Sequence, residues 1–270
     1  MTSCLTGRTL LATALLLAAG GARAEPVAVR FTEGLVHGFL ALRTLEGKSL
    51  ADGDLIQVAR GDRVTTRLVF RFKDGSTSDE TVVFTQRRQL RLVSDHVVQK
   101  GPAFEKPMDA TIEAASGQVT VRYTDDGKEK SESVRMKLPP DLANGMILTL
   151  LKNVDPKVAR TTVSMLAFTP KPRVVKLQIE PGGEEPFTLG GTSRKAVRYV
   201  VKVDIGGIAG VLAPLFNKQP PDSSVWILGG EAPAFVKSES PMFVGGPLWR
   251  IELVSPVWPE ARPDTAPSPK

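Results

Sequence analysis

The chain has 270 residues, 41% of them apolar and 24% charged, with one cysteine, two histidines and a formal net charge of +6. The apolar share is typical of a globular protein and too high for a disordered chain. One cysteine excludes an intramolecular disulfide framework and a cysteine-ligated zinc or iron–sulfur site, and two histidines leave little material for a histidine-rich metal site. We therefore expect no cofactor.

Residues 1–24 have the pattern of a secretory signal peptide. Arg8 supplies an early positive charge, the apolar run after it is too short to span a bilayer, and the segment ends in a small-x-small cleavage site. We expect cleavage between Ala24 and Glu25 and export to a bacterial-type periplasm. Cleavage removes Arg8 and Arg23 together with the single cysteine, so the net charge of +6 falls to +4. No later segment approaches the length of a transmembrane helix.

Most of the remaining chain alternates apolar and polar residues with period two, which predicts half-buried β-strands. The alternating runs Arg67–Phe72 and Thr81–Phe84 flank Lys73–Ser76, whose Asp-Gly pair predicts a hairpin turn. A second hairpin is expected at Asp126–Gly127. The further strands that this pattern predicts cover residues 89–99, 119–123, 132–138, 174–179, 196–205 and 225–228.

One segment departs from the strand pattern and predicts an amphipathic helix over residues 140–153. Leu142, Met146 and Leu150 recur at four-residue spacing, which places them on one helix face. Pro140 suits a first helical turn and Asn153 suits a helix end. A single helix among antiparallel strands needs a sheet face to cover.

The predicted fold class is therefore mainly β: an antiparallel, strongly curved sheet or unclosed half-barrel, with one amphipathic helix packed on its concave face. Residues 25–258 are expected to form a single β-rich domain, although a division into two smaller units near 170–172 stays open. Residues 259–270 contain four prolines and little apolar content, which predicts a disordered tail.

No motif for catalysis stands out in the mature chain. It contains no G-x-S-x-G elbow, no H-x-x-x-H pair and no EF-hand loop. The glycine-rich stretch 206–210 lacks the spacing of a phosphate-binding loop, so we interpret it as a strand exit. His96 shares the alternating face of Leu90 and Leu92 and is expected at a core position, and His37 is also expected to be structural. A hydrolase remains a third interpretation, since Asp, Glu and Ser are plentiful but form no visible constellation.

The segment from Gly206 to Pro259 differs from the rest, because it holds all three tryptophans, three Gly-Gly pairs and many prolines. The aromatic residues could simply form the core beneath bends of the sheet, or they could line an apolar groove. For the groove we expect five wall residues and three polar rim residues. The wall residues are Phe70, Met146, Leu150, Trp226 and Trp249, and the rim residues are Lys237, Glu239 and Arg250.

The order of these features along the chain resembles that of a known family of proteins. The chain resembles uncharacterised bacterial periplasmic proteins that are related in shape to the lipoprotein localisation factors of the Lol system. The resemblance rests on a signal peptide, meandering strands, one mid-chain helix introduced by Leu138–Asp141 and the closing strand Val225–Leu228. The resemblance covers about residues 54–254 and is one of pattern, without a specific motif. It implies an unclosed antiparallel barrel with the helix against its apolar interior, which in the carrier members takes up lipid acyl chains.

Two functions follow as hypotheses. The first is an exported, non-enzymatic binding protein of the cell envelope that holds an apolar or lipid-like ligand between sheet and helix. The second is an envelope interaction or assembly module with a solid core and an exposed Trp/Phe docking surface, whose partner is another envelope protein. Nucleic acid is not expected as a partner, because the basic residues are scattered and alternate with apolar ones along strands.

Overall fold

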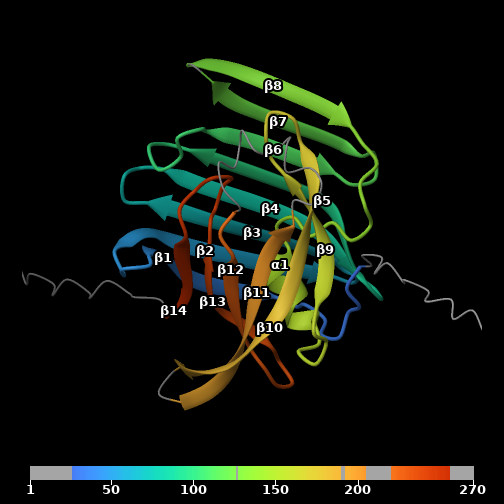
Figure 1. Ribbon diagram of the computed structural model, residues 1–270, viewed down its shortest axis with the longest axis vertical. Helices are drawn as coiled ribbons and strands as arrows, with labels where there is room; N and C mark the ends of the chain where they lie inside the picture. Colours follow the sequence, from blue (N-terminus) through green and yellow to red (C-terminus); the bar gives the residue numbers. More distant parts are fainter. Residues whose placement is uncertain (1–25, 126, 190–191, 205–219, 256–270) are drawn as a thin grey trace, which may run out of the picture.

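The computed structural model describes residues 26–125, 127–189, 192–204 and 220–255. The predicted signal peptide and its cleavage site, the stretch 206–210, Trp258 and the predicted tail lie outside these residues. The described chain forms one helix and fourteen strands (Figure 1). Their bounds are β1 (Val36–Thr44), β2 (Ser49–Arg60), β3 (Arg63–Phe72), β4 (Thr77–Gln86), β5 (Leu90–Lys100), β6 (Met108–Glu113), β7 (Gln118–Asp125), β8 (Lys128–Arg135), α1 (Ile147–Asn153), β9 (Thr161–Ala167), β10 (Arg173–Leu189), β11 (Thr192–Asp204), β12 (Ser223–Leu228), β13 (Ala234–Ser240) and β14 (Trp249–Val254).

All fourteen strands belong to one antiparallel sheet, in the order β8-β7-β6-β5-β4-β3-β2-β1-β14-β13-β12-β11-β10-β9. The sheet therefore consists of two meanders, β1–β8 and β9–β14, which meet where β1 pairs with β14. The order ends at β8 and β9, so the sheet is unclosed. The mainly β, antiparallel class is confirmed, and β9 and β10, on either side of residues 170–172, pair directly.

Strands from both meanders contribute to one buried cluster, which we call the main core. It joins residues of β4–β7 to residues of β9–β12, although these strands lie far apart in the strand order. The sheet must therefore curl until its two meanders face each other. In Figure 1, β9–β12 cross in front of the β1–β8 meander, and α1 lies at the crossing.

The predicted hairpins are confirmed where the structure describes them. The first turn separates β3 from β4, and its Gly75 has a φ of 86°, a left-handed conformation that glycine adopts without a Cβ clash. Phe70 and Phe72 of β3 are buried, as their alternation predicts. The second turn separates β7, which ends at Asp125, from β8, which begins at Lys128.

The expected core position of His96 is wrong. The pairing of β4 with β5 shifts between Val83 and Phe84, so Val93 is an extra residue that opposes no partner in β4. Such a bulge changes which face the following side chains occupy. His96 is therefore exposed on the outer face, where its Nε2 lies 3.0 Å from Asp109 Oδ1, and Asp95 is fully buried in its place.

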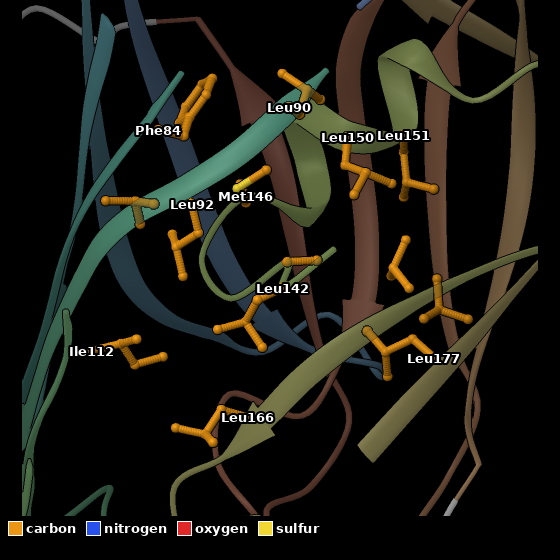
Figure 2. Packing of buried hydrophobic residues seen from close by; sticks show 14 of the residues in the cluster. Phe84, Leu90, Leu92, Ile112, Leu142, Met146, Leu150, Leu151, Leu166 and Leu177 are labelled. Atoms are coloured by element: carbon orange, nitrogen blue, oxygen red, sulfur yellow. The ribbon is translucent and has the colours of Figure 1, made fainter. Parts of the chain in front are cut away.

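The helix begins later than predicted, at Ile147 instead of residue 140, and ends at Asn153 as predicted. Gly145 has a φ of 62°, which is incompatible with a continuous right-handed helix, so the chain turns there before α1 begins. Leu142, Met146 and Leu150 are still buried together in the main core. Figure 2 shows them between Leu90 and Leu92 of β5 on one side and Leu166 and Leu177 of β9 and β10 on the other.

The turn before α1 covers the free edge of β9. Leu142 forms a parallel bridge with Ser164, and the amide of Ala143 donates to the carbonyl of Ser164 at 2.9 Å. The Asn144 side chain accepts a hydrogen bond from the Leu166 amide at 2.7 Å and donates one to the Leu166 carbonyl at 2.9 Å. Covering an edge strand satisfies backbone groups that would otherwise pair with another chain. The requirement to cover β9 explains why residues 141–144 form a bridge and turns instead of the predicted helix.

Candidate functional site

A cavity of about 640 Å³ lies against the inner face of β1–β4. Two rows of cross-strand neighbours form its floor. The first row runs Gly38, Leu55, Leu68 and Glu80 across β1–β4, and the second runs Val36, Gln57, Thr66 and Val82 across the same strands. These residues share one face because side chains two apart on a strand point the same way.

Other parts of the chain complete the cavity. They are Gly145 with the helix α1 that follows it, the segment Arg30–Gly34 that precedes β1, residues 231–235 at the start of β13, and Leu253 of β14. Exposed lining residues, among them His37 and Glu231, mark the side that meets solvent. Apolar side chains from all these elements surround the space, namely Phe31, Val36, Leu40, Leu55, Leu68, Val82, Leu148, Pro233, Phe235 and Leu253.

The cavity lies between two parts of the hydrophobic core. Val82 belongs to the main core, whereas Leu40 belongs to a second buried cluster, which we call the aromatic end cluster. In this cluster the rings of Phe72 and Trp249 are 5.6 Å apart, and those of Phe104 and Phe243 pack edge to face at 5.6 Å. The cavity is therefore bounded on two sides by closely packed side chains.

Glu33 is the centre of a satisfied polar network on one side of the cavity. Its carboxylate accepts hydrogen bonds from Lys152 Nζ at 2.6 Å and from Gln57 Nε2 at 2.8 Å. Gln57 in turn accepts a hydrogen bond from the Thr66 hydroxyl at 3.2 Å. The Glu33 backbone exchanges two hydrogen bonds with the side chain of Gln86. Since the Glu33 and Lys152 charges neutralise each other, this side of the cavity carries no net charge.

A second polar group, the carboxyl pair of Glu80 and Asp95, has no such partners. Glu80 lines the cavity, and the described residues offer it no hydrogen bond or ion pair. Asp95 is fully buried, and within the described chain both of its carboxylate oxygens lack a hydrogen-bond partner. Asp95 is the cross-strand neighbour of Val82, so it continues the second floor row one strand beyond the cavity.

Gly145 brings the chain close to this carboxyl pair. A Cβ at this position would lie 3.1 Å from Glu80 Oε1 and 3.4 Å from Asp95 Oδ1. Both carboxyl groups therefore face the same backbone position, which itself lines the cavity. Burial raises the pKa of Glu80 from its ordinary 4.5 to about 7. Burial, and then the nearby Glu80 charge, also raises the pKa of Asp95 well above its ordinary range.

The five predicted wall residues are all buried, but none of them lines this cavity. Met146 and Leu150 pack inside the main core, and Phe70 and Trp249 pack in the aromatic end cluster. Phe70 lies across Gly53, where a Cβ would come within 2.4 Å of its ring. The ring therefore fills the space beside the glycine and does not extend into the cavity.

Trp226, the fifth predicted wall residue, lies on the opposite face of the sheet. It alternates along β12 with Val225 and Ile227, which point into the main core. On the outer face Lys237 Nζ lies 3.8 Å from the centroid of the Trp226 ring, and the indole N–H donates to Glu185 at 2.7 Å. Trp226 is 6% exposed, because these neighbours cover it.

The three predicted rim residues also lie away from the cavity. Lys237 covers Trp226, and Glu239 accepts a hydrogen bond from its cross-strand neighbour Arg250 at 2.9 Å. His37, expected to be structural, is exposed and lies 2.7 Å from Asp54. The sequence did contain one signal for this cavity, because Glu80 shares the alternating face of Val82 and Phe84, where a charged residue is unusual.

The described chain is thus an open antiparallel sheet, curled around a two-part core, with a partly polar cavity beneath a short helix. No helix in the described ranges is long and apolar enough to cross a membrane. Those ranges also hold no group of three or more His, Cys, Asp or Glu side chains arranged to bind a metal ion.

Comparisons with known proteins give one structural likeness. No family model matches the chain, and no curated protein matches its sequence. Among solved structures, the crystal structure of a β-barrel-like protein from Brucella abortus, of the domain of unknown function DUF1849, is similar with a TM-score of 0.44 and 10% sequence identity. The similarity covers 83% of this chain and 98% of that protein.

Proposed function

We propose that the chain is an exported, non-enzymatic binding protein of the bacterial cell envelope that holds an apolar or amphipathic, lipid-like molecule. The cavity between α1 and the inner face of β1–β4 carries this proposal. Its volume of about 640 Å³ falls within the range of small-molecule sites, and apolar side chains provide most of its lining. The export that the first 24 residues predict would bring the protein to a compartment where such ligands occur.

Burial of the apolar part of a ligand would drive binding, at roughly 25 cal/mol per Å² before ordering costs are subtracted. The alternative of an exposed Trp/Phe docking surface gains no support from Trp226 and Trp249, because they are 6% and 8% exposed. Native mass spectrometry of protein purified from the periplasm, followed by organic extraction, tests the proposal. A bound lipid is the expected result, and a protein that neither carries a lipid nor binds an added apolar probe contradicts it.

Filling the cavity should abolish binding without unfolding the protein. Leu148 lines the cavity from α1, so Leu148→Trp places an indole in the empty space. We expect it to weaken binding of the fluorescent probe N-phenyl-1-naphthylamine by about tenfold or more, with less than about 1 kcal/mol lost in stability. Probe titration and urea unfolding measure the two effects.

Met146→Trp is the matched control, two residues earlier in the chain. Met146 is 2% exposed inside the main core, so the larger side chain overpacks it and costs about 1–3 kcal/mol. The folded fraction of this variant should bind the probe as wild type does. If Leu148→Trp binds the probe normally, the ligand does not occupy this cavity.

A further inference from the structure

The cavity has an acidic end whose hydrogen-bonding capacity is unused. Glu80 reaches the cavity from β4, and Asp95 stands behind it on β5 with both oxygens unpartnered. An ionised carboxylate only accepts hydrogen bonds, so Glu80 calls for a donor once it has lost its proton. Leaving a buried polar group without a partner is costly, and a ligand that supplies the partner recovers that cost.

The basic side chains around the cavity already have acidic partners. Lys152 of α1 pairs with Glu33 at 2.6 Å, Arg30 pairs with Asp155 at 3.7 Å, and His37 of β1 pairs with Asp54 at 2.7 Å. Glu231, between β12 and β13, is exposed to solvent. No cation of the described chain therefore neutralises the carboxyl pair, and the local field at this end of the cavity is negative when the pair ionises.

Resting on the proposed function, we infer that the ligand is a cationic amphiphile, whose primary ammonium group binds Glu80, with Asp95 behind it, and whose apolar chain lies along Leu55, Leu68 and Leu148. An ammonium group offers three N–H donors and one positive charge, which is the complement of an ionised carboxylate that has no cation beside it. The apolar chain runs from Glu80 along its own row, since Leu68 and Leu55 are the next members of that row toward β1.

The inference predicts a dependence of affinity on pH. Binding of a cation requires an ionised carboxylate, and burial raises the pKa of Glu80 to about 7. A primary alkylammonium, like a lysine side chain, stays protonated well above this value. Affinity should therefore rise by about tenfold or more between pH 5.5 and pH 8, over the range in which Glu80 loses its proton.

The experiment compares three probes with the same eight-carbon chain on the full-length mature protein, by isothermal titration calorimetry. Octylammonium should bind about tenfold more tightly than octan-1-ol at pH 8, octanoate should bind most weakly, and only octylammonium should bind more tightly as the pH rises. Glu80→Gln should remove the preference for octylammonium over octan-1-ol. Asp95→Asn should reduce the preference in part, because Asp95 acts from behind Glu80.

Glu239→Gln is the matched control, since it makes the same carboxylate-to-amide change away from the cavity and should alter none of the three affinities. Urea unfolding confirms that each variant is folded. If octan-1-ol or octanoate binds as tightly as octylammonium, or if Glu80→Gln keeps the preference, the inference fails while the proposed function stands. If none of the three probes binds, the proposed function fails with it.

Discussion

The protein is expected to lose about 3 kcal/mol of stability as the pH rises from about 4.5 to about 7, through Glu80 alone. Its pKa is 4.5 in an ordinary environment and about 7 in the folded protein, so the folded state holds a proton that the unfolded state releases over this interval. Stability is therefore complete below the ordinary pKa and falls until the pH passes the folded-state value. Asp95, whose pKa burial also raises, adds to the loss in the same direction.

Urea unfolding at a series of pH values measures this effect, and the difference between wild type and Glu80→Gln isolates it. At pH 5 the two proteins should have similar stability, because wild-type Glu80 is protonated and resembles glutamine. At pH 8 the variant should be more stable than wild type by about 3 kcal/mol. The control Glu239→Gln should follow the wild-type pH dependence. Parallel pH curves for wild type and Glu80→Gln would show that Glu80 does not titrate in a buried environment.

Much of the fold could be predicted from local patterns. The alternation in residues 67–72 and 81–84, with Asp-Gly between them, was sufficient to place β3 and β4. Such a hairpin is specified by neighbouring residues, which a pattern reports directly. The meeting of β1 with β14 could not be predicted in this way, because pairing between the two ends of the chain leaves no local signature.

The site was harder to predict, for three physical reasons. The bulge at Val93 is a property of the pairing with β4, so alternation alone placed His96 inside and Asp95 outside. The turn before α1 depends on covering the edge of β9, which residue spacing does not reveal. The aromatic content predicted a groove at Trp226 and Trp249, but both rings pack closely against their neighbours, and other residues line the cavity.

Substitutions of two buried asparagines, nine residues apart in the chain, should distinguish an effect on stability from an effect on ligand release. Asn153 Oδ1 accepts hydrogen bonds from the amides of Arg30 and Phe31, both at 2.8 Å, and its Nδ2 donates to the Thr149 carbonyl at 3.0 Å. It thereby fixes the segment Arg30–Gly34, which lines the cavity, to the end of α1. Asn144 instead fixes the turn before α1 to Leu166 of β9, away from the cavity.

Asn144→Ala should lower the free energy of unfolding by about 3 kcal/mol, because it leaves the buried amide and carbonyl of Leu166 without the Asn144 side chain as a hydrogen-bond partner. Asn153→Ala should cost about 2 kcal/mol, since water reaches part of the segment it releases. The expected difference lies in dissociation of N-phenyl-1-naphthylamine, measured by stopped-flow fluorescence on the folded proteins. Asn153→Ala should release the probe several-fold faster than wild type, and Asn144→Ala should release it at the wild-type rate. Equal release rates for the two variants would mean that residues 30–34 do not retain the ligand.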